Sequence, residues 1–176
     1  DMAIFGKALG NGYAITAVIG NRSIMEAAQS TFISSTFWTE RIGPSAALKT
    51  LEVMEREKSW DKITQTGRLI GERWQSLASK YELPINISGL PSMIGFSLTV
   101  PEMLKYKTLI TQEMLKKKIL AATSVYTCID HNQSILDLYF DELEPIFSLI
   151  KECEMGRSID DLLDGPVCHS GFKRLN

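Results

Sequence analysis

Residues 1–25 read DMAIFGKALGNGYAITAVIGNRSIM, and the prediction of the fold starts from this stretch. Two short apolar runs, residues 2–5 and 16–20, are bounded by glycine, a pattern that predicts two short buried strands. The Gly-Asn-Gly at residues 10–12 favours a loop between them, because these residues tolerate positive φ angles. A single lysine, Lys7, therefore lies between two segments that the pattern predicts to be buried.

A lysine in this setting has two interpretations. Burial in an apolar pocket lowers the pKa of a lysine amine, and the neutral amine forms an imine with an aldehyde such as that of pyridoxal phosphate. Alternatively, Lys7 ends a strand and keeps its ammonium group in water, which the spacing alone favours. The Gly-x-Gly at residues 10–12 is too short for a dinucleotide-binding fold, which needs a third glycine leading into a helix.

The remainder of the chain alternates helical and extended patterns, which predicts an α/β fold. Helices are expected over residues 21–28, 44–57, 59–81, 101–117 and 132–152. Residues 85–100 are expected to form two strands around a turn at Gly89–Pro91, and residues 119–129 a further extended segment. Asn21 or Ser23 caps the first helix and Asn132 the last, and Pro145 predicts a kink. Residues 29–43 are expected to form a loop. We place a domain boundary near Lys58.

Two of these helices carry an apolar face at spacings of three and four, which predicts that they pack on the core. The residues of the two faces are Trp60, Ile63, Ile70, Trp74, Leu77 and Tyr81, and Ile135, Leu138, Tyr139, Ile146, Leu149 and Ile150.

The composition excludes several classes of function. The chain has 176 residues and a net charge of −2 without a basic stripe, so we expect no nucleic-acid partner. No apolar run is long enough to span a bilayer, and the first residues do not resemble a signal peptide. Three widely spaced cysteines and two histidines predict no metal site and favour the reducing cytoplasm.

The opening stretch resembles the lysine segment of class III pyridoxal-phosphate aminotransferases, and the glutamate-1-semialdehyde aminotransferase group in particular. Members have an acidic residue, an apolar strand, the Schiff-base lysine, a glycine-rich turn and a strand ending in Gly-x-Arg. By this resemblance Lys7 is the Schiff-base lysine, which also moves a proton between substrate and cofactor. The resemblance implies pyridoxal 5'-phosphate as cofactor and a small-molecule amino donor and acceptor as substrates.

A second segment, SSTFWTERIGPSAALKTLEVM at residues 34–54, resembles the family stretch in which a threonine heads a loop before a helix of small residues. In the family this threonine binds the cofactor phosphate of the neighbouring subunit. The resemblance therefore gives Thr36 a cofactor-binding role and implies a homodimer whose sites are shared across subunits.

The resemblance extends over the rest of the chain through GLPSMIGFSL, SVYTCIDHNQSILDLYF and GPVCHSGFKRLN. It implies the C-terminal portion of a fold-type-I transferase. Residues 1–57 would end the large cofactor domain, residues 58–155 would form the small α/β domain, and residues 156–176 a tail. In that family the aspartate that pairs with the pyridine nitrogen lies upstream of Asp1, so the isolated chain is expected to be inactive or nearly so.

Two alternatives to transamination stay open. The first alternative is that the chain is a non-catalytic fragment or assembly module with an incomplete active site. The second is that the protein is a glutamate-1-semialdehyde 2,1-aminomutase. The aminomutases carry a glutamate in the strand before the late histidine, where this sequence has Thr123, which argues against the second alternative.

Several polar residues near these motifs have no assigned role. Arg41 is a candidate for a substrate carboxylate or for an interface ion pair, and Trp38 and Glu40 for a substrate pocket or a subunit interface. His131 is interpreted as a capping or packing residue before a helix. His169 has no predicted function.

Overall fold

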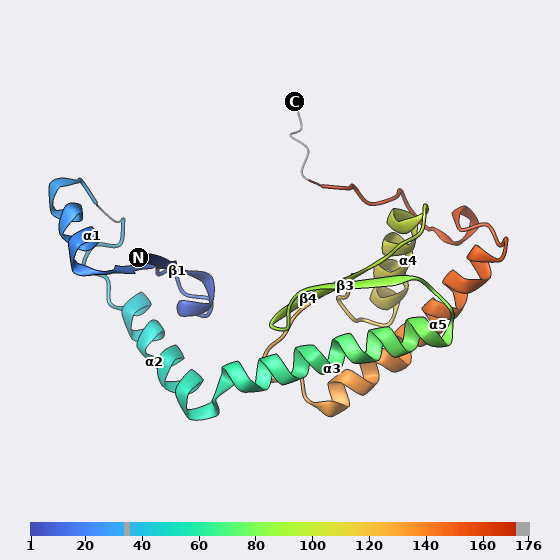
Figure 1. The fold of residues 1–176 in the computed structure, drawn as a ribbon, viewed down its shortest axis with the longest axis horizontal. Helices are drawn as coiled ribbons and strands as arrows, with labels where there is room; N and C mark the ends of the chain where they lie inside the picture. Colours follow the sequence, from blue (N-terminus) through green and yellow to red (C-terminus); the bar gives the residue numbers. More distant parts are fainter. Residues whose placement is uncertain (34–35, 172–176) are drawn as a thin grey trace. The chain divides into compact units, whose positions relative to one another are not determined.

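The computed structural model describes residues 1–33 and 36–171, and the chain divides into two compact units, Asp1–Ser59 and Trp60–Asn176 (Figure 1). We describe each unit by itself. Within the described residues, no helix is both long and apolar enough to cross a membrane.

The first unit contains a two-stranded antiparallel ribbon and short helices. Its elements are β1 (Met2–Phe5), η1 (Lys7–Leu9), β2 (Ala17–Gly20), α1 (Arg22–Ala27), η2 (Ala28–Ser30) and α2 (Ile42–Glu57). The ribbon pairs Met2 with Gly20 and Phe5 with Ala17, so η1 lies in the connection that closes it. Of the two predicted caps, Asn21 and Ser23, the structure has Asn21, whose Oδ1 accepts a hydrogen bond from the backbone N–H of Ile24 at 3.2 Å.

The prediction that both strands are buried is wrong for this unit. Met2, Ile4 and Phe5 of β1 and Val18 and Ile19 of β2 are all largely exposed. A two-stranded ribbon buries little surface by itself, and the described residues of the unit do not cover its apolar side chains. The short apolar runs bounded by glycine identified the strands but not what covers them.

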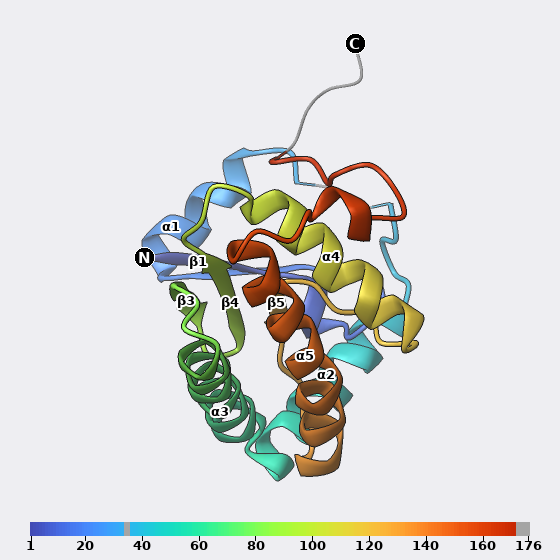
Figure 2. The same ribbon diagram turned by 90° about the vertical axis from the view of Figure 1, so that its right-hand side faces the viewer.

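The second unit packs helices on a three-stranded antiparallel sheet (Figure 2). Its elements are α3 (Ser59–Lys80), β3 (Ile85–Leu90), β4 (Met93–Leu98), α4 (Met103–Lys116), β5 (Ser124–Tyr126), α5 (Gln133–Glu154) and η3 (Asp160–Leu162), and the sheet order is β3-β4-β5. The hairpin follows the predicted turn, with Gly89 at φ 94°. Asn132 caps α5 as predicted, accepting from Ile135 N–H at 3.1 Å, and Pro145 lies inside this helix.

The core of the second unit lies between the sheet and helices α3 and α5. Phe96 of β4 is buried, and its ring lies 4.8 Å from the Trp74 ring of α3 and 6.0 Å from the Phe147 ring of α5. Trp74 Nε1 donates a hydrogen bond to the Tyr139 hydroxyl of α5 at 3.0 Å. These contacts place both helices on the same face of the sheet.

Some predicted core positions and boundaries differ from the structure. Trp60 is exposed because α3 meets the β3–β4 turn further along, at Gly67, where an added Cβ would lie 1.8 Å from the Pro91 carbonyl oxygen. Ile135 and Leu138 are also exposed, because α5 buries Leu136, Phe140 and Leu143 instead. Helix α2 begins two residues before Pro44, and only three residues of the predicted extended segment at 119–129 form a strand.

Replacing Tyr139 by Phe tests the buried polar contact of this core. The variant leaves Trp74 Nε1 in the interior without its acceptor, so we expect a loss of about 1–3 kcal/mol in the free energy of unfolding. Urea unfolding followed by circular dichroism measures this loss. Tyr126→Phe is the control, since Tyr126 is exposed; equal midpoints for the two variants would contradict the assigned role.

Candidate active site

The loop that carries Lys7 is built around a strained backbone. Lys7 has φ 44°, in the left-handed region that residues other than glycine rarely adopt. Its carbonyl oxygen accepts hydrogen bonds from the N–H groups of Gly10 and Asn11, the latter at 3.1 Å. Tyr13 N–H donates to Gly10 O at 3.1 Å and closes the next turn. Such strain persists only where the surrounding contacts fix the backbone, and it is frequent at functional sites.

Gly10 permits the tight path of this loop. A Cβ atom at this position would lie 2.1 Å from the Tyr13 carbonyl oxygen and 2.8 Å from Ile15 Cγ2. No side chain fits there without moving the backbone. The glycine of the motif is therefore required by a close approach of the chain to itself, and the loop that places Lys7 depends on it.

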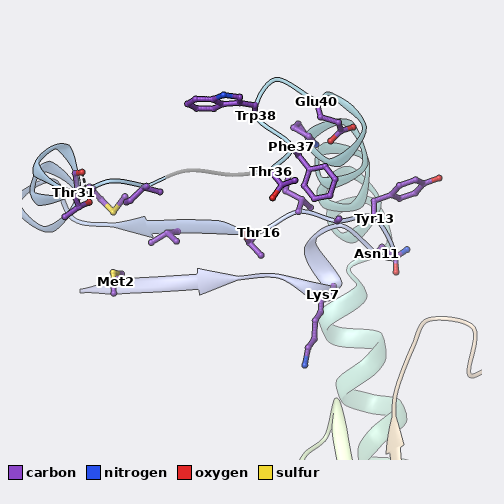
Figure 3. Close-up of a pocket in the computed structure, with 18 of the residues that line it drawn as sticks. Met2, Lys7, Asn11, Tyr13, Thr16, Thr31, Thr36, Phe37, Trp38 and Glu40 are labelled. Atoms are coloured by element: carbon purple, nitrogen blue, oxygen red, sulfur yellow. Dashed lines mark hydrogen bonds between the residues drawn. The ribbon is translucent and has the colours of Figure 1, made fainter.

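An open groove of about 1490 Å³ in the first unit is lined by both residues that the sequence singled out, Lys7 and Thr36. Tyr13, Phe37 and Trp38 contribute aromatic side chains to its wall. Lys7 is exposed, as in the interpretation that keeps its ammonium group in water, and the described residues do not supply the apolar enclosure of the other interpretation. In Figure 3 the Lys7 side chain extends away from Thr36 and Phe37. The two candidates share a groove but do not point at a common centre.

Thr36 begins a turn that is tied to helix α2. Glu40 N–H donates to Phe37 O at 2.7 Å, and Trp38 within the turn has φ 37°. The Glu40 carboxylate accepts hydrogen bonds from the N–H groups of Ile42 and Gly43 at the start of α2. Glu40 also lines the groove. The sequence raised Glu40 only as a pocket or interface residue and missed this capping role, although an acidic residue just before a helix is a recognisable signal.

The other polar candidates lie elsewhere. Arg41 occupies the N-cap position of α2 and is exposed, but it is not among the residues that line the groove. His131 belongs to the second unit, where its Nδ1 accepts from Cys128 N–H at 3.3 Å just before α5. His169 is exposed in the segment after η3. Across residues 1–33 and 36–171, no three His, Cys, Asp or Glu side chains form a group that could hold a metal ion.

Comparisons with known proteins point to one family. A family model described as aminotransferase class-III matches residues 1–129. The chain is 36% identical over 113 residues to a 3-aminobutyryl-CoA aminotransferase from Cloacimonas acidaminovorans, covering 64% of this chain and 27% of that protein. It is 22% identical over 164 residues to a glutamate-1-semialdehyde 2,1-aminomutase from Methanocaldococcus jannaschii, covering 84% of this chain and 38% of that protein.

Solved structures share the fold. The FumI protein of Sphingopyxis sp. MTA144, described in a form with pyridoxal phosphate, matches 90% of this chain with a TM-score of 0.80 at 17% identity. An omega-transaminase from Sphaerobacter thermophilus matches with a TM-score of 0.74 at 13% identity over 84% of this chain. The α/β fold predicted from the sequence is thereby confirmed. The chain spans 39% of the FumI chain and 38% of the transaminase, so it corresponds to a portion of that fold.

The close packing at Gly10 predicts the effect of a single methyl group. Gly10→Ala is expected to lower the free energy of unfolding by about 1–3 kcal/mol, because the backbone between Gly10 and Ile15 must shift. The thermal unfolding midpoint measures this change. Gly165→Ala is the matched control, since an added Cβ there meets no atom within 4 Å; a Gly10→Ala midpoint equal to that of the control would refute the close approach.

Proposed function

The chain belongs to the class III aminotransferase family. From that premise we propose that the protein transfers an amino group between an amino compound and a keto or aldehyde partner, with Lys7 as Schiff-base lysine. The observation that carries the proposal is the place of Lys7. It is a primary amine on a strained, glycine-dependent loop, and it lines an open groove.

Pyridoxal 5'-phosphate is the cofactor we propose, and the residues present fit it. Its aldehyde requires a primary amine, which Lys7 offers, and its phosphate requires hydrogen-bond donors, of which the Thr36 hydroxyl is one. When bound, this cofactor supplies an electron sink that stabilises negative charge at the substrate carbon bearing the amino group. The chemistry left to the protein is binding, orientation and proton transfer.

Lys7 has two roles in this proposal. Its Nζ would hold the cofactor covalently until the substrate's amino group takes its place in that bond. The freed Lys7 amine would then act as the base that moves the proton of the substrate carbon bearing the amino group. The backbone hydrogen bonds to the Lys7 carbonyl hold the residue in place for this task. A base on a fixed loop loses less entropy on reaching the proton than one on a mobile loop.

Thr36 is proposed to serve the site of the neighbouring subunit. In Figure 3 the Lys7 side chain extends away from Thr36, which supports separate sites for the two residues of one chain. A homodimer then has two sites, each with Lys7 from one protomer and Thr36 from its partner. The exposed apolar side chains of β1 and β2 lie in the same unit and support an assembly that covers them.

The groove lacks a partner for a pyridine nitrogen among its described residues. Glu40 is the one acidic residue in its described lining, and its carboxylate already accepts from the backbone at the start of α2. The isolated 176-residue chain is therefore proposed to be inactive or nearly so, as a non-catalytic fragment would be. The activity is proposed for a protein that also supplies a carboxylate to the pyridine nitrogen.

The proposal extends to domains, substrates and location. Residues 1–57 end a large cofactor domain, residues 58–155 form the small domain and residues 156–176 a tail, supported by the division of the structure after Ser59. The substrates are small molecules, and transamination is favoured over the aminomutase reaction because Thr123 stands where the aminomutases have a glutamate. Cys128, Cys153 and Cys168 are free thiols, which supports a cytoplasmic location.

Trapping the covalent bond to Lys7 tests the proposed function. The complete gene product is loaded with pyridoxal phosphate, reduced with borohydride and analysed by peptide mapping, which should find the label on Lys7. The Lys7→Ala variant should carry no label at this position, and its activity should fall by at least about a thousandfold. Lys58→Ala is the matched control, because Lys58 is exposed in the same unit and has the same left-handed backbone, with φ 47°. Labelling of another lysine in place of Lys7 would contradict the proposal.

A further inference from the structure

We infer that Glu40 is a positioning residue, which holds the turn that carries Thr36 in place for the cofactor phosphate. This inference rests on the proposed function, because it assigns Glu40 its task through Thr36. The residue acts through backbone contacts and does not touch the reacting atoms.

The carboxylate of Glu40 is committed to helix α2. Gly43 N–H lies 3.3 Å from Oε1 and 3.2 Å from Oε2, and Ile42 N–H donates to Oε1. The first N–H groups of a helix have no partners within the helix, and the helix dipole makes this end favourable for a negative charge. Both oxygens therefore face the helix start. This geometry argues against a role for Glu40 as a direct partner of the cofactor ring.

The strained backbone of the turn before Glu40 must be stabilised by contacts with other residues. Trp38 has φ 37° and is 80% exposed, so its own packing contributes little to offset the strained backbone. Glu40 supplies two contacts to this turn, through its N–H to Phe37 O at 2.7 Å and through its carboxylate to α2. Removing the carboxylate leaves the first of these contacts and loses the second.

Helix α2 in turn rests on the loop that follows Lys7. A Cβ atom at Gly43 would lie 2.8 Å from Ala14 O and 3.2 Å from Ile15 Cβ, and the same Ile15 packs against Gly10. The start of α2 is thus in close contact with the segment that closes the Lys7 loop. Through its hydrogen bonds to Gly43, Glu40 connects the Thr36 turn to the start of α2, which contacts the Lys7 loop. The position of Thr36 therefore depends on that of the Lys7 loop in the same chain.

The test compares two ligands that differ in the phosphate alone. In the complete gene product, Glu40→Ala is expected to raise the dissociation constant of pyridoxal phosphate about tenfold, because the free energy lost with a helix cap corresponds to a factor of about this size. The dissociation constant of pyridoxal, which has no phosphate, should rise less than twofold. Glu40→Gln retains one carbonyl acceptor and should fall between wild type and Glu40→Ala for pyridoxal phosphate. Glu55→Ala is the control, an exposed glutamate on the same helix, and should bind both ligands as wild type does.

Hydrogen exchange gives a readout that does not depend on the cofactor. Amides of residues 36–43 should exchange faster in Glu40→Ala than in wild type or Glu55→Ala, because the turn and the helix start lose their shared contact. Unchanged pyridoxal phosphate binding in Glu40→Ala, or an equal loss for pyridoxal, would overturn the inference. A wild-type protein that bonds neither ligand at Lys7 would instead remove the proposed function, and this inference with it.

Discussion

Between β1 and β2 the chain must reverse direction, and it does so with Lys7 in the left-handed region and Gly10 pressed against the Tyr13 carbonyl. Neither feature is favourable by itself, since the first strains a residue with a side chain and the second admits glycine alone. The hydrogen bonds that converge on the Lys7 carbonyl maintain this path. The place of the amine, the wall of the groove and the contact with α2 all follow from it.

Local rules predicted much of the fold. Asn132 was predicted to cap α5, and either Asn21 or Ser23 to cap α1, because a short polar side chain just before an apolar periodic stretch can accept a hydrogen bond from the first N–H groups of a helix. Asn21 and Asn132 both accept this bond. The hairpin was predicted from Gly89 and Pro91 for a similar reason. Burial was predicted less well, because it depends on what a segment packs against. Trp60 fits the periodic face of α3 but lies before Gly67, where that helix meets the β3–β4 turn.

The candidate site divides in the same way. Lys7 and Thr36 were found through a resemblance between motifs, and the structure adds that both line one groove with side chains that diverge. Glu40 was raised only as a pocket or interface candidate, because its effect depends on the register between a turn and a helix that begins two residues earlier than Pro44 suggested. The two apolar runs that flank Lys7 were predicted to be buried, and they proved exposed in this chain.

The central claim is that each site joins Lys7 of one protomer to Thr36 of its partner, and mixed dimers test it most directly. A purified heterodimer of one Lys7→Ala chain and one Thr36→Ala chain of the complete gene product has one intact site if the residues act across the interface, and none if they act within one chain. At a limiting concentration of pyridoxal phosphate we predict about half the wild-type activity for this heterodimer. Activity no higher than the mean of the two parent homodimers would contradict the account.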